Sequence, residues 1–499
     1  MDFAVRKTGD SRFSIFDLRS GVIVQCPLRL LGLAVFLLAA GTQGAESPLG
    51  EAAPLAPTRQ ACLSLAEQME THLKDEVLAK WFPACVDKEH GGFHANFTHD
   101  WKRGPDTSKF LVFQGRMTWV SARVAMRYPG LADAYKDYAR HGVKFLNEVM
   151  WDKESGGLFW GLDQEGHVCA QFGDEKHAYG ISFGIYGAAA AYEATRDAEA
   201  LDLAKRTFAW LDKNAHDPVN GGYYEALRRD GKPILTPPTP GKRLDGIGTL
   251  YGCKSMNTHI HLLEALTELY RVWPDKQLEA RLREMLAIVR DKIAVPPGCL
   301  NLYFTPDWRP LPDHDSFGHD VETAFLLLEA TEALDFGGRQ PISKQTEISG
   351  TDSQFPNGRK LVSVPEIKTL AVARSLVDHA LEWGWDGQYG GFYDKGAAFT
   401  SAYGLDKVWW TQAEGLNALL LMHEKFGNTT PRYFQAFLKQ WDFIWKYQAD
   451  HQHGEWYETV SREGKPVPNQ AKGQIWKAAY HNGRALLNVS AALRRLAGK

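Results

Sequence analysis

The sequence predicts an all-α protein in which six helical hairpins stack into a closed ring, an α/α toroid, with short strands in the loops. Two observations lead to this prediction. A glycine-rich signature returns about every 65 residues, and two stretches with helical periodicity lie between successive copies. A hairpin of this kind cannot bury its apolar face alone, so neighbouring units must stack, and a ring leaves no unit exposed at an end. An open solenoid is the alternative arrangement of the same hairpins.

The signature pairs two glycines with a hydrophobic and usually aromatic residue. Its second position falls at 92, 157 and 222, and again at 391 and 455. A short alternating stretch and a polar turn follow, as is typical of a brief strand. The wider gap between the third and fourth copies has room for one more unit around 298–308. The copies are Gly91-Gly92-Phe93, Gly156-Gly157-Leu158, Gly221-Gly222-Tyr223, Gly390-Gly391-Phe392 and the variant Gly454-Glu455-Trp456.

Each interval between signatures has the length of two helices. Apolar residues at i, i+3 and i+4, with many Ala, Leu, Glu and Lys, predict helices at 111–128, 131–150, 177–197 and 198–215. Six units give twelve helices, and alternate helices would line the inside of the ring. The segment 336–365 is rich in Gly, Ser, Thr, Gln and Pro and lacks this periodicity. Because the repeat resumes beyond it, we expect a surface loop rather than a domain linker.

Composition and charge indicate which kinds of molecule the protein could bind. The 499 residues carry 57 Lys and Arg against 60 Asp and Glu, a net charge of −3, so no nucleic-acid surface is indicated. The chain holds 16 Trp, 18 Tyr and 25 Phe, which suits an aromatic-lined sugar pocket, although large helical cores also use such residues. Disorder, collagen and a polytopic membrane protein are excluded.

The N-terminus contains one strongly apolar run, Leu30–Ala40, with Arg29 before it and small residues up to Ala45. The run is too short to span a bilayer and predicts a signal peptide cut near residue 45; a buried helix is the alternative. We therefore expect an extension at 1–45 and a single catalytic domain at 46–499 without stable membrane insertion. That domain would be secreted or periplasmic, or cytoplasmic if the signal does not work.

The cysteines that follow the predicted cut are odd in number, widely spaced and without a C-x-x-C motif. This pattern indicates buried free thiols rather than a disulfide framework or a zinc site. These cysteines are Cys62, Cys85, Cys169, Cys253 and Cys299.

Histidines with polar partners recur on alternate predicted helices. Asn257, His261 and Glu264 share one helical face by their i, i+4, i+7 spacing. His319 and Glu322 stand at i, i+3, and His481 and Arg484 repeat that relation, so the carboxylate of Glu322 could orient the His319 ring. A lone histidine near a helix end is usually a cap, but three on alternate helices favour a shared site.

Two other pairs of neighbouring residues could bind a ligand. His259 and His261 stand at i, i+2 and would point to different sides of a helix, so a shared metal is not indicated. Trp409 and Trp410 could stack on sugar rings or belong to the core. The chain has no P-loop, dinucleotide fingerprint or G-x-S-x-G elbow, which argues against phosphoryl transfer, hydride transfer and serine hydrolysis.

Several blocks closely resemble the N-acylglucosamine 2-epimerase family and, within it, the cellobiose 2-epimerases. The blocks are KSMNTHIHLLEA (254–265), GHDVETAFLLL (318–328), WWTQAE (409–414), YHNGR (480–484) and KHAY (176–179). The resemblance implies an (α/α)6 barrel and epimerisation or isomerisation of sugars at C2 without a cofactor.

The resemblance also assigns roles to residues of this chain. It implies that His319 and His481 are acid/base residues flanking C2, and that His261 binds the sugar and assists ring opening. Arg116 would stabilise the enediolate oxygen, and Glu322 would support His319. The remaining substrate-binding positions that it implies are Tyr179, Asn257, Glu264, Trp409, Trp410 and Glu414.

These observations predict a cofactor-independent and metal-independent 2-epimerase acting on the reducing-end glucose or mannose of a β-1,4-disaccharide. Two imidazoles suit proton removal and return next to an aldehyde, because their pKa lies near neutrality. The alternatives are an N-acylglucosamine 2-epimerase, an aldose–ketose isomerase of the mannose type, an inverting glycoside hydrolase and a non-catalytic sugar-binding protein. We expect a monomer or a weak homodimer.

Overall fold

The computed structural model describes residues 57–335, 337 and 364–498, which fall in one compact unit. The predicted signal peptide lies outside the described residues, as does most of the predicted loop at 336–365. No helix in the described ranges is long and apolar enough to cross a membrane. The five cysteines that they contain are free thiols, of which Cys62, Cys85 and Cys299 are buried and Cys169 and Cys253 half-buried.

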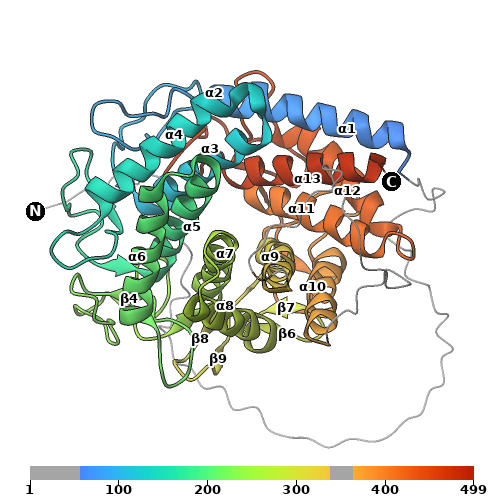
Figure 1. The fold of residues 1–499 in the computed structure, drawn as a ribbon. Coiled ribbons are helices and arrows are strands. Elements are labelled where there is room, and N and C mark those ends of the chain that lie inside the picture. Colours follow the sequence, from blue (N-terminus) through green and yellow to red (C-terminus); the bar gives the residue numbers. More distant parts are fainter. Residues whose placement is uncertain (1–56, 336, 338–363, 499) are drawn as a thin grey trace, which may run out of the picture. The chain divides into compact units, whose positions relative to one another are not determined.

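Six inner helices form a ring in which each packs against the next, and the last packs against the first (Figure 1). These helices are buried on nearly every side, as their continuous apolar and small residues require. The inner helices are α3 (Leu111–Arg127), α5 (Ala178–Thr195), α7 (Met256–Val272), α9 (Phe317–Asp335), α11 (Trp409–Phe426) and α13 (His481–Gly498).

An outer helix packs against each inner one. The predicted ring of twelve helices, an (α/α)6 barrel, is therefore confirmed for the described part of the chain, which also holds the short α2 (Ala79–Trp81). The predicted helix at 131–150 changes at residue 146 into a π-helical turn, Leu146–Met150. The outer helices are α1 (Arg59–His72), α4 (Ala132–Phe145), α6 (Ala198–Ala215), α8 (Lys276–Ile288), α10 (Val364–Trp383) and α12 (Arg432–Phe443).

Short antiparallel strands lead into the inner helices and fix where these helices begin. The strand before an inner helix pairs with a strand of the following unit: β1 with β2, β3 with β4, β5 with β8, β10 with β11 and β13 with β14. Those strands are β1 (Lys109–Phe110), β2 (Gly161–Leu162), β3 (Lys176–His177), β4 (Ala226–Leu227), β5 (Lys254–Ser255), β8 (Tyr303–Phe304), β10 (Asp315–Ser316), β11 (Lys395–Gly396), β13 (Lys407–Val408) and β14 (Thr459–Val460). The others are β6 (Ala294–Val295), β7 (Cys299–Leu300), β9 (Pro310–Leu311) and β12 (Ala402–Gly404).

The glycine signature forms a tight turn, and in four of its copies this turn lies directly before a strand: β2, β4, β11 or β14. Gly92 has a φ of 65°, and a Cβ there would lie 2.6 Å from Oε1 of Gln114, so only glycine fits without strain. In the last copy Glu455 takes the corresponding position with a φ of 63°. Its buried carboxylate accepts hydrogen bonds from Trp81 and Lys477, which hold this less favourable backbone.

A buried lysine–aspartate pair locks each signature turn. In the third copy, Nζ of Lys254 lies 2.7 Å from Oδ2 of Asp217 and also donates to the carbonyl of Gly221. Because the lysine belongs to the strand that starts an inner helix, the pair ties that helix to its turn. The sequence analysis did not identify these pairs, which are Asp87–Lys109, Asp152–Lys176, Asp217–Lys254, Asp386–Lys407 and Asp450–Lys472.

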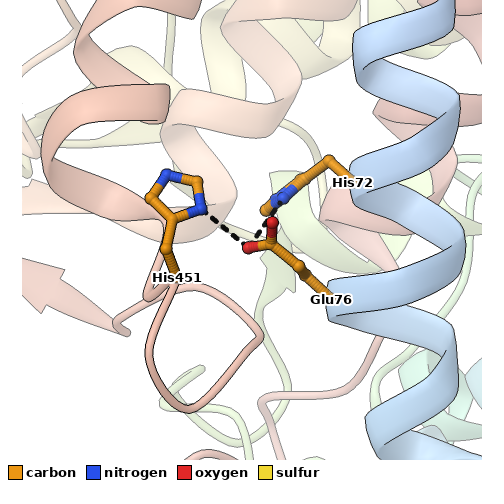
Figure 2. Close-up of side chains that lie close together, drawn as sticks. All are labelled: His72, Glu76 and His451. Carbon is orange, nitrogen blue, oxygen red and sulfur yellow. Dashed lines mark hydrogen bonds and ion pairs between the residues drawn. The ribbon is translucent and has the colours of Figure 1, made fainter.

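The ring closes where the first outer helix meets the last signature turn (Figure 2). Glu76 lies between two imidazoles, with its Oε2 2.8 Å from Nδ1 of His451 and 3.2 Å from Nδ1 of His72. The other ring nitrogens are also used: Nε2 of His72 accepts from the Trp456 indole, and Nε2 of His451 lies 2.8 Å from the carbonyl oxygen of Trp445. This cluster joins residues more than 370 positions apart.

We expect Lys254→Met to lower the free energy of unfolding by about 3–5 kcal/mol, because it leaves the carboxylate of Asp217 buried without its cation. Denaturant unfolding followed by circular dichroism would measure the change. Lys232→Met, at an exposed lysine paired with Asp230, is the matched control and should cost little. Equal losses in the two variants would contradict a structural role for the buried pair.

Candidate active site

The N-terminal turns of the inner helices bring the predicted site residues to one end of the ring. His261 lies in α7, His319 in α9 and His481 at the first residue of α13. Most of these side chains are buried, whereas Asn257, His319 and Trp410 are partly exposed. Three histidines from different helices therefore meet in one region, as the spacing on alternate helices predicted.

Arg484 lies at the centre of this region and is 1% exposed. Its Nη2 donates to Oε1 of Glu322 and to Oε1 of Glu414, each at 2.6 Å. Its Nη1 donates to Oε1 of Glu264 and to the hydroxyl of Tyr480. Four inner helices, α7, α9, α11 and α13, are thus joined through a single guanidinium.

The charges of this cluster set its protonation. Burial alone would raise the pKa of Glu264, but Arg484 and His261 hold it at about 2, so this carboxyl is ionised. Burial raises the pKa of Glu414 despite Arg484. Burial disfavours the charged form of Arg484 as well, yet Glu414 and the other carboxylates keep its pKa well above the usual range. The Arg484 cation therefore favours the ionised forms of Glu264 and Glu414.

His261 has the partner that its helical face predicted. Its Nδ1 lies 2.9 Å from Oε2 of Glu264, three residues further along the same helix. The rings of Tyr179 and Phe183 pack against the imidazole, with centroids 5.2 and 4.9 Å away. A carboxylate on Nδ1 holds the proton there and leaves Nε2 as an acceptor.

His481 is held by a different helix from the one its spacing indicated. Its Nδ1 lies 2.7 Å from Oε1 of Glu414 on α11, while Arg484, three residues along, turns to the carboxylates instead. Burial, reinforced by the nearby Arg116, lowers the pKa of His481 well below its usual value. A neutral imidazole with Nδ1–H bound to a carboxylate presents a basic Nε2.

His319 also differs from the expectation in its hydrogen bond. Its Nδ1 lies 2.7 Å from Oγ of Ser316, not from Glu322, whose carboxylate is bound to Arg484. Burial lowers the pKa of His319 to about 4, and the charge of Glu322 opposes that shift. Glu322 therefore acts on His319 through its charge, while Ser316, which the sequence analysis did not single out, orients the ring.

Aromatic and cationic side chains surround the histidines. The ring of Trp410 lies 4.7 Å from His319 and 5.9 Å from His481, whereas Trp409 is buried in the wall beside His481. The Arg116 guanidinium stacks 4.9 Å from the Tyr480 ring and donates to the Trp476 carbonyl.

Two further polar residues differ in how they relate to this site. The side-chain oxygen of Asn257 has no hydrogen-bond partner among the residues that the structure describes. His259 points elsewhere, because its Nδ1 lies 2.7 Å from the Ser255 carbonyl and its Nε2 accepts from the Tyr223 amide. His259 and His261 therefore do not face a common point.

Comparison with known proteins gives a consistent result. The family model for N-acylglucosamine 2-epimerase (GlcNAc 2-epimerase) matches residues 91–344 and 364–485. A cellobiose 2-epimerase of Bacteroides fragilis is 30% identical over 426 residues, which is 85% of this chain and 98% of the relative. The solved structure of cellobiose 2-epimerase from Spirochaeta thermophila superposes with a TM-score of 0.72 at 30% identity, covering 88% of this chain and 98% of the other.

A D-mannose isomerase of Marinomonas mediterranea is similar at lower identity, 25% over 423 residues, covering 84% of this chain and 96% of the relative. The family model covers well over half of the chain and includes all the inner-helix turns that carry the histidines. The chain therefore belongs to the N-acylglucosamine 2-epimerase family of carbohydrate epimerases and isomerases.

Proposed function

We propose that the protein is a 2-epimerase that interconverts glucose and mannose at the reducing end of a β-1,4-linked disaccharide. The observation that carries this proposal is that two imidazoles from different helices, His319 and His481, both lie beside the Trp410 ring, with ring centroids 4.7 and 5.9 Å from it. The similarity to cellobiose 2-epimerases over 85% of the chain supports the substrate class. A sugar stacked on Trp410 would present its C2 between the two rings.

In the proposed reaction, one imidazole removes the C2 proton and the electron pair of the C–H bond passes into an enediolate. His481 is suited to this step, because Glu414 holds its Nδ1–H and leaves Nε2 free to take a proton. The other imidazole, protonated from solvent, then delivers that proton to the opposite face of C2 and becomes neutral, while the first imidazole returns its proton to solvent. The charge of Glu322 favours the protonated form of both rings and so helps each to serve as the acid.

Two other groups have proposed roles before and during proton transfer. His261, paired with Glu264, would exchange a proton with the ring oxygen and so open the pyranose, since an acidic C2 proton requires the free aldehyde. Arg116 would face the enediolate oxygen, where a fixed cation in a buried site is most effective. Stacking of the guanidinium between Phe183 and Tyr480 holds it in place.

The alternative reactions, aldose–ketose isomerisation and inverting glycoside hydrolysis, can be compared with this arrangement of side chains. An isomerase would use the same enediolate but return the proton to C1, and the similarity to a D-mannose isomerase supports that as a second candidate. An inverting glycoside hydrolase needs carboxyl groups about 6.5–9.5 Å apart across the sugar. Glu322 and Glu414 instead have oxygens within 4.8 Å of each other, both bound to Arg484.

We also propose that the protein is exported from the cytoplasm. This proposal rests on the apolar run at 30–40 alone.

Incubation with cellobiose, mannobiose, lactose, mannose and N-acetylglucosamine, followed by chromatography of the products, would test the substrate class. We expect the disaccharides to give C2 epimers faster than the monosaccharides react. A ketose as the main product would favour the isomerase, and conversion of N-acetylglucosamine alone would favour the N-acylglucosamine epimerase. Release of monosaccharides from cellobiose without epimerisation would contradict the proposal.

Turnover in D₂O should place deuterium at C2 of the epimer, because the imidazole that delivers the proton exchanges with solvent. His319→Ala or His481→Ala should reduce epimerisation by on the order of 10² or more. A variant lacking one imidazole should still exchange the C2 proton of one epimer through the other. His167→Ala, at a highly exposed histidine, is the control and should behave as the parent protein. Epimer formed without deuterium would exclude the mechanism.

The rate of C2-hydrogen exchange should fall on the acid side of its pH profile, the acid limb, only at a pH well below the usual pKa of histidine. Burial holds the pKa of His319 near 4, so the basic, neutral ring persists from pH 7 to about pH 5 and is lost as the pH approaches 4. Exchange rates measured by NMR from pH 7 to pH 4 would show where this loss of activity occurs. Because Glu322 raises the pKa of both rings, Glu322→Gln should move the limb to lower pH. An upward move, or a parent limb near pH 6.5, would contradict this assignment.

A further inference from the structure

Three clusters of histidine and carboxylate side chains in the described residues have ligand atoms close enough to share a metal ion. In the cluster of Glu322, Glu414 and His481, the negative charge already has the Arg484 guanidinium. In the cluster of His72, Glu76 and His451, the two imidazoles flank the single carboxylate and their other nitrogens are engaged (Figure 2). The third cluster differs from both.

The third cluster consists of Asp315 on β10, Asp320 on α9 and His379 on α10, and we call it the aspartate–histidine cluster. The three residues are 1%, 0% and 4% exposed. Nδ1 of His379 lies 3.0 Å from Oδ2 of Asp320 and 3.6 Å from Oδ2 of Asp315. Two carboxylates and one imidazole thus face one another in the interior, behind the strand that leads to His319.

In the part of the chain that the structure describes, this cluster has no counter-cation apart from the imidazole. Among the residues that the structure describes, no lysine or arginine forms an ion pair with either aspartate, in contrast to the lysine-paired aspartates of the signature turns. Within the described ranges, both oxygens of Asp315 and Oδ1 of Asp320 lack a well-aligned hydrogen-bond partner, although the backbone amides of Ser316 and Leu300 lie close to the two carboxylates. Native proteins rarely leave buried carboxylate oxygens without a partner, because the charge is then costly to bury.

The electrostatics agree with a missing positive charge. Burial raises the pKa of Asp315 to about 8, with a further contribution from Asp320, and burial raises the pKa of Asp320 well above its usual value. Burial also raises the pKa of the nearby Cys299 thiol to about 12, and the two aspartates add to that shift. Burial lowers the pKa of His379, so the imidazole tends to be neutral and can offer a lone pair.

The spacing of the donors fits a bound cation. Ligand atoms about 2.0–2.1 Å from a tetrahedral zinc ion lie roughly 3.3 Å from one another. The two separations from Nδ1 of His379, 3.0 and 3.6 Å, lie on either side of that value, and the ligand atoms of all three residues lie within 4.8 Å of one another. Carboxylate oxygen and imidazole nitrogen are donors that Zn²⁺ and Mn²⁺ both accept.

We propose that Asp315, Asp320 and His379 bind one divalent cation of the zinc or manganese type, and that this ion is structural. It joins β10, α9 and α10 directly behind the active site. Ser316, which holds the His319 ring, follows Asp315 in sequence, and Asp320 follows His319. The ion would therefore fix the start of α9 without contacting the sugar. The proposal does not rest on the reaction assigned above.

The test is the metal content of protein purified without metal-affinity resin, measured by elemental mass spectrometry. The protein is assayed as purified, and again after EDTA dialysis and reloading with Zn²⁺ or Mn²⁺ alone. We expect about one equivalent per chain after reloading and an increase in Tm of several degrees over the stripped protein. Asp315→Asn and His379→Gln should each bind less than a tenth of an equivalent and lose that increase. Glu76→Gln, in the other histidine cluster, is the matched control and should bind as the parent does.

Stripped protein should retain epimerisation at 25 °C, with a pH profile like that of the loaded protein, and should inactivate sooner on heating. Two results would overturn the proposal. In the first, the parent protein takes up neither ion and Asp315→Asn is at least as stable, which indicates that the two carboxyl groups are neutralised by protons. In the second, Glu76→Gln loses the ion while both cluster variants keep it, which places the site elsewhere. If Asp315→Asn does not fold, as judged by circular dichroism, the metal content and Tm of His379→Gln alone decide whether the cluster binds the ion.

Discussion

The arrangement of the active site depends on the buried guanidinium of Arg484. Carboxylates from three inner helices point to it, and each of these carboxylates lies close to one of the histidines of the candidate site. Glu264 holds His261, Glu414 holds His481, and Glu322 acts on both His319 and His481 through its charge. Without the cation, three acidic groups could not stay ionised so close together, and the histidines would lose the groups that set their tautomers. The ring of helices brings these charged side chains together, and the positive charge of Arg484 offsets the repulsion between the carboxylates.

The lysine–aspartate pairs of the signature turns hold the scaffold together, as Arg484 holds the carboxylates of the candidate site. Four of them fix a signature turn to the strand that begins an inner helix, and His261 lies near the start of one of those helices, α7. Small residues then allow close helix packing; a Cβ on Gly115, for example, would lie 2.3 Å from the Phe183 carbonyl oxygen on the neighbouring helix. The geometry of the site is therefore determined at the loop end of the barrel, where pairing and turn chemistry are strongest.

Much of this architecture could be predicted from the sequence, because the glycine period and the helical periodicity are local signals. The His261–Glu264 pair was also predictable, since both residues lie on one helix face. The partners of His319 and His481 were not, because in a barrel the nearest carboxylate can come from an adjacent helix. The lysine of each signature pair was equally hidden: its separation from the aspartate is 22 residues in the first copy and 37 in the third. The repeated aspartate four residues before each glycine pair was visible, but its partner was not.

The two ends of the described chain lie side by side. Arg59, at the start of α1, donates to the Ala497 carbonyl near the end of α13, and Arg494 binds Glu70 on α1. In addition, the amide of Phe97 in the first unit bonds to the carbonyl of Gly473 in the last. Backbone and side-chain hydrogen bonds thus join the last hairpin of the barrel to the first. In topological terms, non-covalent contacts between the last hairpin and the first complete a ring from hairpins that the chain itself joins only in a row.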